Sequence, residues 1–366
     1  MGLNLVVGED CSLPLPWLRA PLTAALTASR GHALLVHGAT GVGARAFAFT
    51  LAQAWLCEAR DAPGGAAGPC GRCGSCRLVQ SRVHPDLTVL LPETLRRELD
   101  WPLPDDKPDS ERKPSRQIRV DDVRLLIERS TRTSARGRGK VLLLHPAEAL
   151  NGQAANALLK TLEEPAAGTR LLLTASDPAL LLPTVRSRCQ QLRLDAPPAD
   201  IAVAWLRGQG VTNEADALTL LSACSGRPLD ALDWLQAGVD ARAWAGLPAA
   251  MAAGQGAALT GWPVPRVVDA LLKLCHDAMA RAAGAPARYF PQAAVPARGD
   301  AARLSAWSRE LQRVARHDEH PWHEALLVDA LVRGAAAALS MPPRAQAAAQ
   351  ATARAAGPRG FDTLSR

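Results

Sequence analysis

Short apolar runs alternate with amphipathic segments along the first half of the chain. Each run is four or five residues long, which suits a buried strand, and the segments between the runs have helical spacing. The runs cover residues 33–36, 87–91, 141–144, 171–174 and 190–194. This alternation predicts an α/β fold in which a parallel sheet carries helices on both faces.

Two of the intervening segments have clear helix boundaries. Residues 120–133 carry Asp121 and Asp122 in the first turn, and residues 151–164 begin with Asn151 as a cap and stop before Pro165. By contrast, residues 93–117 are rich in Pro, Asp, Glu, Lys and Arg. We expect this stretch to be a solvated insertion.

The pattern changes at the sequence Ala-Pro-Pro-Ala of residues 196–199, beyond which only helical spacing recurs. The sequence therefore predicts an α/β domain over 1–195, a small helical domain over 196–240 and a helical bundle over 241–340. Residues 341–366 have no apolar face, and we expect them to be a disordered tail.

Composition narrows the class of protein. The chain has 366 residues, 48% of them hydrophobic, a net charge of +7 and an isoelectric point near 9.2. This basic excess is compatible with a nucleic-acid partner but equally with a merely solvated surface. A single Tyr and 4% aromatic residues argue against a base-stacking platform. Since no apolar run reaches membrane-spanning length and no signal segment follows Met1, we expect a cytoplasmic protein without membrane contact.

Four of the eight cysteines are clustered in sequence, which favours a metal site in a cytosolic chain. The thiolates of Cys57, Cys70, Cys73 and Cys76 can close a tetrahedral structural zinc site. Iron–sulfur ligation and unligated thiols are the alternatives. The other four cysteines are isolated and are expected to be buried; they are Cys11, Cys189, Cys224 and Cys275.

Residues 38–45 have the glycine frame of a phosphate-binding loop, with Gly38, Gly41 and Gly43 between a predicted strand and a helical stretch. The residues that would do the chemistry are absent, because Ala44 replaces the Lys and Arg45 replaces the hydroxyl residue. After the strand 141–144, His145-Pro146 replaces the acids that would hold Mg²⁺. We interpret the loop as a structural turn that does not hydrolyse ATP, and a live site that uses Arg45 is the alternative.

Three motifs resemble one known family. The sequence Asn-Ala-Leu-Leu-Lys-Thr-Leu-Glu-Glu-Pro at 156–165, Ser187-Arg188-Cys189, and His84-Pro85-Asp86 after the cysteine cluster resemble the clamp-loader branch of the AAA+ proteins. The substitutions at 44 and at 145–146 are similar to those of the delta-prime family of bacterial DNA polymerase III.

The resemblance implies an AAA+ (RecA-like) core, a helical lid over 196–240 and a C-terminal all-α collar over 241–340 that assembles with other subunits. It implies a non-hydrolysing stator of the clamp loader, which works with tau/gamma and delta subunits to load the sliding clamp onto primed DNA. By the same resemblance the four clustered cysteines bind zinc, and Arg188 is an arginine finger for the ATP of a neighbouring tau/gamma subunit. Leu229 stands where ATP-using relatives carry a sensor arginine.

The resemblance also implies a bacterial cytoplasmic protein that meets the nucleoid through the replisome. Two rival functions stay open at this point. One is an AAA+ ATPase with a degenerate but live site at Arg45, and the other is a zinc-dependent nucleic-acid-binding protein whose α/β part is a scaffold.

Overall fold

A computed structural model describes residues 5–28, 31–59, 68–101, 113–296, 299–316 and 323–340. The chain forms two compact units. The first contains Met1–Trp205 together with Arg227–Asp230, and the second contains Leu206–Gly226 together with Ala231–Arg366.

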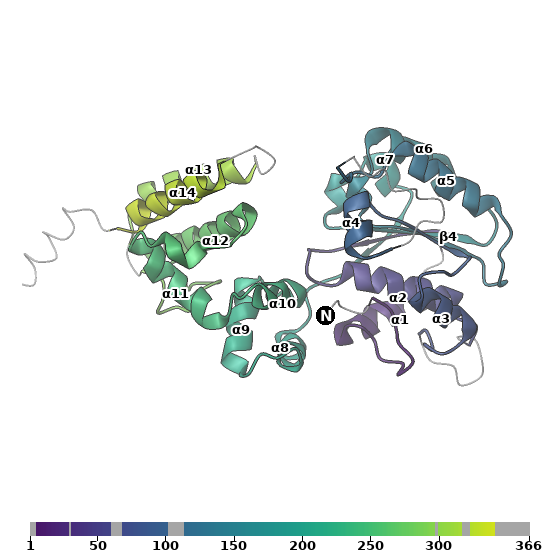
Figure 1. Ribbon diagram of the computed structural model, residues 1–366, viewed down its shortest axis with the longest axis horizontal. Helices are drawn as coiled ribbons and strands as arrows, with labels where there is room; N and C mark the ends of the chain where they lie inside the picture. Colours follow the sequence, from purple (N-terminus) through teal and green to yellow (C-terminus); the bar gives the residue numbers. More distant parts are fainter. Residues whose placement is uncertain are drawn as a thin grey trace, which may run out of the picture. The chain divides into compact units, whose positions relative to one another are not determined.

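The first unit is built on a five-stranded sheet in the order β2-β3-β4-β1-β5, and neighbouring strands pair in parallel (Figure 1). The central register places Leu35 of β1 opposite Leu173 of β4 on one side and Gln191 of β5 on the other. The strands are β1 Ala33–His37, β2 Leu87–Leu90, β3 Lys140–Leu144, β4 Thr169–Ala175 and β5 Gln190–Arg193. All five predicted strands are thus confirmed.

Helices cover both faces of this sheet, with α1 and α2 on one side and α5 and α6 on the other (Figure 1). Phe47 and Phe49 of α2 are fully buried in one core cluster, and Leu126 of α5 and Leu158 of α6 are buried in the other. The helices are α1 Arg19–Ala28, α2 Ala44–Leu56, α3 Gly74–Gln80, α4 Glu93–Glu98, α5 Val120–Thr131, α6 Gly152–Glu163 and α7 Pro183–Arg186. This two-sided arrangement confirms the predicted α/β fold class.

The two helices with clear sequence boundaries form as predicted. Asn151 caps α6, and its side-chain oxygen accepts the backbone N–H of Ala154 at 2.8 Å. At the start of α5, Asp122 Oδ2 accepts the backbone N–H of Arg119 at 3.0 Å, one half of a capping box. These caps fix where both helices begin.

The prediction of a solvated insertion at 93–117 is wrong for the first part of that stretch. Residues Glu93–Glu98 form α4, and Leu95, Leu99 and Trp101 pack against the core cluster that contains α2. The Trp101 ring lies 4.9 Å from that of Phe49. These apolar side chains are scattered among charges in the sequence, so the composition of the stretch hid them. Residues 102–112 lie outside the described residues.

Beyond β5 every described element is helical, as predicted. In the second unit Trp244 is fully buried and stacks on Phe290 with ring centroids 4.1 Å apart. The helices that follow the sheet are α8 Ala199–Gly208, α9 Glu214–Ala223, α10 Pro228–Gln236, α11 Ala241–Ala252, α12 Val264–Ala282, α13 Ala301–Ala315 and α14 Glu324–Leu339. The boundaries of the lid and the collar stay predictions, and residues 341–366 lie outside the described residues.

Among the described helices, none combines the length and the apolar character that a membrane crossing requires.

Candidate functional site

The glycine loop connects the end of β1 to the start of α2, as the sequence predicts, and Gly43 is the N-cap residue of α2. Gly41 has a φ of +79°, in the left-handed region that favours glycine. At Gly38 an added Cβ would lie 2.3 Å from the carbonyl oxygen of Leu194, at the end of β5. The glycine frame is therefore required by backbone geometry and close packing, whether or not a ligand binds.

Groups from distant parts of the first unit close over this loop. Trp17 Nε1 donates to the carbonyl oxygen of Val42 at 2.8 Å, and the backbone N–H of Leu229 donates to that of Gly41 at 3.1 Å. A Cβ at Gly41 would lie 2.2 Å from Asp230 Oδ1. Asp230 in turn forms an ion pair with Arg227 at 2.5 Å. An Arg–Asp ion pair thus occupies the space beside a loop that has the glycine frame of a phosphate-binding loop.

His145 stands at the end of β3, where a nucleotidase would carry acids. Burial, helped by the positive charge of Arg45, lowers the pKa of His145 to about 3. Its Nδ1 lies 2.6 Å from Thr174 Oγ1 on the neighbouring strand β4. A neutral imidazole engaged with a hydroxyl group is a poor substitute for carboxylates that hold Mg²⁺.

Glu148 is the nearest acid in sequence to His145, and one oxygen of its carboxylate is engaged while the other, Oε2, is buried without a hydrogen-bond partner among the described residues. Glu148 Oε1 accepts the backbone N–H of Ser176 at 2.9 Å and its hydroxyl at 2.7 Å. Thr174, Ser176 and Asp230 are neighbours of this end of the strands that the sequence did not predict. No local motif marks them, because each is brought there by strand pairing or by a contact with a remote segment.

The four clustered cysteines converge as predicted, and their sulfur atoms lie within 4.8 Å of one another. Cys57 directly follows α2, Cys73 caps the N-terminus of α3, and Cys76 lies within α3. The Sγ atoms are 3.9 Å apart both for Cys57 and Cys73 and for Cys70 and Cys76. Four sulfurs around one zinc ion at the usual Zn–S distance would be about 3.8 Å apart. The cluster therefore has the ligand type and the spacing to hold a metal ion.

Hydrogen bonds within the cluster favour a thiolate. The side-chain hydrogen bond from Cys76 lowers the pKa of Cys57 to about 4, and the same bond raises the pKa of Cys76. A backbone N–H adds to this at Cys57, since Cys70 N–H donates to Cys57 Sγ at 3.4 Å, whereas burial raises the pKa of Cys73. Metal ligation needs deprotonated sulfur, so these donors prepare the cluster for a cation.

The isolated cysteines divide into two groups. Cys189, Cys224 and Cys275 are buried, as expected. Cys11 is exposed, so the expectation of burial is wrong there. Its Sγ donates to the carbonyl oxygen of Cys70 at 3.1 Å, which shows that it supports the cysteine loop from outside.

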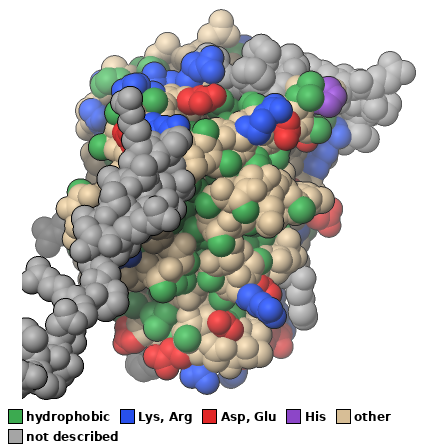
Figure 2. All heavy atoms as spheres, turned by 90° about the vertical axis from the view of Figure 1, so that its left-hand side faces the viewer, with side chains coloured by type: hydrophobic (Ala, Val, Ile, Leu, Met, Phe, Trp, Pro, Cys, Tyr) green, Lys and Arg blue, Asp and Glu red, His purple; other side chains and the backbone are tan. Residues whose placement is uncertain are grey.

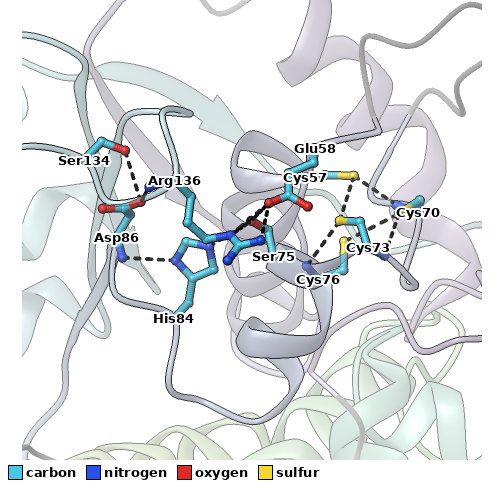
Figure 3. A network of polar contacts seen from close by, with 10 residues as sticks. All are labelled: Cys57, Glu58, Cys70, Cys73, Ser75, Cys76, His84, Asp86, Ser134 and Arg136. Atoms are coloured by element: carbon cyan, nitrogen blue, oxygen red, sulfur yellow. Dashed lines mark hydrogen bonds and ion pairs between the residues drawn. The ribbon is translucent and has the colours of Figure 1, made fainter.

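A polar network joins the cysteine cluster to the sheet (Figure 3). Arg136 Nε donates to Glu58 Oε1 at 2.8 Å and to Ser75 Oγ at 3.0 Å, so it contacts the residue after Cys57 and the residue before Cys76. The Ser75 hydroxyl also lies 3.2 Å from Nε2 of the buried His84. Asp86 accepts the backbone N–H of Arg136 at 2.9 Å. The His-Pro-Asp motif therefore anchors the cluster to the loop that precedes β3.

Arg188 lies at the amino-terminal end of the parallel strands, whereas the glycine loop lies at their carboxyl-terminal end. It follows α7 and precedes β5, whose Gln190 pairs with Leu34 at the start of β1, whereas Gly38 follows the end of β1. The four paired residues of β5 span about 13 Å between these ends. The structure thus separates Arg188 from the glycine loop of its own chain, while side chain and loop stand on one rigid sheet.

Comparison with known proteins places these features in context. The family model described as "DNA polymerase III, delta subunit" matches residues 22–198. A Pseudomonas aeruginosa protein named DNA polymerase III subunit delta' is 42% identical over 205 residues, 56% of each chain. A Salmonella typhimurium DNA polymerase III subunit tau is 35% identical over 210 residues, 55% of this chain and 28% of that protein.

The chain spans between a half and two thirds of the length of the delta' subunits of Pseudomonas aeruginosa, Haemophilus influenzae and Escherichia coli to which it is similar. Among solved structures, a DNA polymerase III gamma subunit-related protein of Thermotoga maritima is similar with 18% identity and a TM-score of 0.35, over 87% of this chain and 92% of that one.

We predict that Gly41→Ala destabilises the first unit by roughly 2–5 kcal/mol, because a Cβ there meets both a left-handed backbone and the Asp230 carboxylate. The matched control is Gly137→Ala, which has a φ of +70° but no atom within 4 Å of the added Cβ. The control should cost only the backbone part, about 1–2 kcal/mol. Urea unfolding measures both, and equal losses would contradict close packing at Gly41.

We further predict that His145 makes the protein sensitive to acid. Its pKa of about 3 in the folded state lies below the value of about 6.5 in an unfolded chain, so it contributes stability above pH 6.5 that is lost as the pH falls toward 3. Between pH 7.5 and 5.5 the loss is about 1.4 kcal/mol. In urea unfolding, the free energy of unfolding of His145→Asn should fall by that much less than the free energy of wild type over this pH range. The control His323→Asn changes an exposed residue and should lose as much as wild type.

Proposed function

The chain belongs, through residues 22–198, to the DNA polymerase III delta subunit family, and from this premise we propose that it is a non-hydrolysing stator subunit of a bacterial clamp loader. In this role it stands beside tau/gamma subunits, hydrolyses no ATP itself, and supplies Arg188 to the ATP site of a neighbour. The sliding clamp, primed DNA and a delta subunit are the other proposed partners of the complex.

The observation that carries this proposal is the position of Arg188 at the amino-terminal end of the strands, opposite to the glycine loop. An arginine so placed is about the length of a strand away from any nucleotide that its own loop could hold. It is partly exposed, with 34% of its side chain accessible, and it is therefore free to meet a ligand on another subunit. A finger that acts in trans needs this arrangement.

The state of the glycine loop supports the absence of hydrolysis by this chain. Ala44 removes the lysine that neutralises phosphate, and neutral His145 removes the acid that holds Mg²⁺. Asp230 adds a carboxylate beside Gly41. Each change acts against a bound triphosphate, and Arg45 alone does not restore a metal ligand. This favours the stator over the rival ATPase.

The chemistry of Arg188 fits the proposed role. A guanidinium group presents a planar fork of donors that matches phosphate oxygens, and it stays charged at any physiological pH. Arginine fingers increase phosphoryl transfer by roughly 10³–10⁵-fold, because they stabilise charge that develops in the transition state. A subunit without its own chemistry can therefore control turnover at a neighbour's site.

The helical unit supplies a surface for assembly in this proposal. Figure 2 views the side on which α13 and α14 lie in Figure 1, and most charged side chains visible there lie toward the top and bottom of the view. Leu326 of α14 is a large apolar side chain that is 65% exposed. Association with a tau/gamma subunit, a class of protein that the chain also resembles, would cover such a side chain.

For the cysteine cluster we propose structural zinc. Four thiolates at the corners of a tetrahedron would leave no open position for a substrate, which is typical of structural rather than catalytic zinc. The ion would fix Cys57 at the end of α2 and Cys73 at the start of α3, and so hold together the segment that the Arg136 network anchors to the sheet.

We predict that Cys70→Ser loses most of the one zinc ion per chain that wild type should contain, because serine is a far weaker zinc ligand. The matched control is Cys11→Ser, which removes a thiol that lies against Cys70 but outside the cluster. Elemental mass spectrometry of the purified proteins measures the zinc content per chain of both variants. Equal zinc loss in the two variants, or iron in the wild type, would refute structural zinc in this cluster.

For Arg188→Ala we expect normal folding, zinc content and assembly, but a fall in DNA-stimulated ATPase of the reconstituted loader. The site that Arg188 serves should slow by roughly 10³-fold or more, so total turnover should lose that site's share. Arg186→Ala, which removes a neighbouring charge at the end of α7, is the control. Unchanged turnover in Arg188→Ala would exclude the arginine finger.

A further inference from the structure

Arg188 does not lie loose on the surface. Its Nε donates to Glu163 Oε1 at 2.6 Å, and its Nη2 donates to the same oxygen. Its Nη1 donates to the backbone carbonyl oxygen of Thr184 at 3.0 Å, with a longer contact of 3.5 Å to the hydroxyl of Ser187. The guanidinium is therefore held on one side by a carboxylate and on another by the backbone of α7.

Both ends of this ion pair stand on rigid parts of the first unit. Glu163 is the last residue of α6, next to Leu162, which is buried in the core cluster on that face of the sheet. Arg188 lies between Val185 and Cys189, which are buried in the same cluster. Because the two backbones share one core, the carboxylate holds the guanidinium in a fixed place relative to the sheet.

The pairing is selective for one of two adjacent acids. Glu164 follows Glu163 in the chain and is also exposed, but its side chain has no hydrogen bond or ion pair to any described residue. The helical position of Glu163 at the end of α6 thus determines which carboxylate reaches Arg188. The chain itself offers Glu164 as a matched control.

The guanidinium group of Arg188 keeps N–H donors available for a ligand while it is paired with Glu163. A guanidinium has five N–H groups, and the close contacts to Glu163 and Thr184 use three of them. One N–H of Nη2 is unused, and the long contact of Nη1 to Ser187 is weak enough to exchange. Since 34% of the Arg188 side chain and 49% of the Glu163 side chain are exposed, the pair itself adds little stability, about 0–1 kcal/mol.

We propose that Glu163 is the positioning residue of Arg188: the ion pair fixes the guanidinium at the subunit surface so that its free N–H donors meet the triphosphate of a neighbouring subunit. The inference rests on the function proposed above. Its benefit is preorganisation, since a side chain that is already held in place loses less conformational freedom when the charged transition state forms.

The test is DNA-stimulated ATPase of the reconstituted loader with Glu163→Ala, Glu163→Gln and the control Glu164→Ala. Glu163→Ala should lower kcat at least about 5-fold at the site that Arg188 serves, with KM for ATP and assembly by pull-down unchanged, because 1 Å of misplacement can cost up to about 100-fold. Glu163→Gln keeps an oxygen acceptor at the same place and should restore most of the rate. Glu164→Ala should equal wild type.

A double variant separates positioning from general damage. In the Arg188→Ala background, Glu163→Ala should cause no further loss, because it acts through Arg188. An additional loss there, or a Glu163→Ala turnover equal to wild type, would overturn the inference. If Arg188→Ala lowers turnover while Glu163→Ala does not, only the positioning role fails. If Arg188→Ala itself leaves turnover unchanged, the arginine finger fails and the positioning role with it.

Discussion

The close packing around the glycine turn is the constraint on which the arrangement of the first unit depends. Gly38 lies against the Leu194 carbonyl at the end of β5, and Gly41 lies against Asp230, which comes from nearly two hundred residues further along the chain. A side chain at either position would force the sheet or the 227–230 segment away. The turn thus joins distant segments, and this packing requires glycine whether or not a ligand binds.

A parallel sheet lets the two ends of its strands carry different chemical groups. All strands run in one direction, so the glycine loop and His145 both lie at the carboxyl ends of strands, on one side of the sheet. The segment that carries Arg188 lies at the amino-terminal ends, on the opposite side. Changes at the carboxyl ends can leave the opposite ends intact, because the central strands β1, β3 and β4 are buried and closely packed. The loss of Mg²⁺ and phosphate ligands is therefore compatible with a surface arginine that remains firmly placed.

The cysteine cluster and the Arg188 pair show the same design on opposite sides of the unit. In each, a charged group on a short connection is held by a partner on a neighbouring helix or loop: Arg136 by Glu58 beside the cluster, and Arg188 by Glu163 at the end of α6. Burial nearby fixes the backbones, and the ion pair fixes only the direction of the side chain. Each ion pair thus holds its arginine in place while part of the arginine side chain stays accessible to solvent.

The sequence by itself determined the strands, the main helices and the set of four clustered cysteines, because strand and helix periodicity, caps and ligand spacing are local properties. It also located the glycine frame and Arg188. Only the tertiary structure decided that Asp230 closes the loop, that Glu163 rather than Glu164 holds Arg188, that Cys11 is exposed, and that Leu95 and Trp101 pack inward within a charged stretch. Each of these depends on segments that are far apart in the chain, and the packing of helices on the sheet brings them together in a way that no local pattern records.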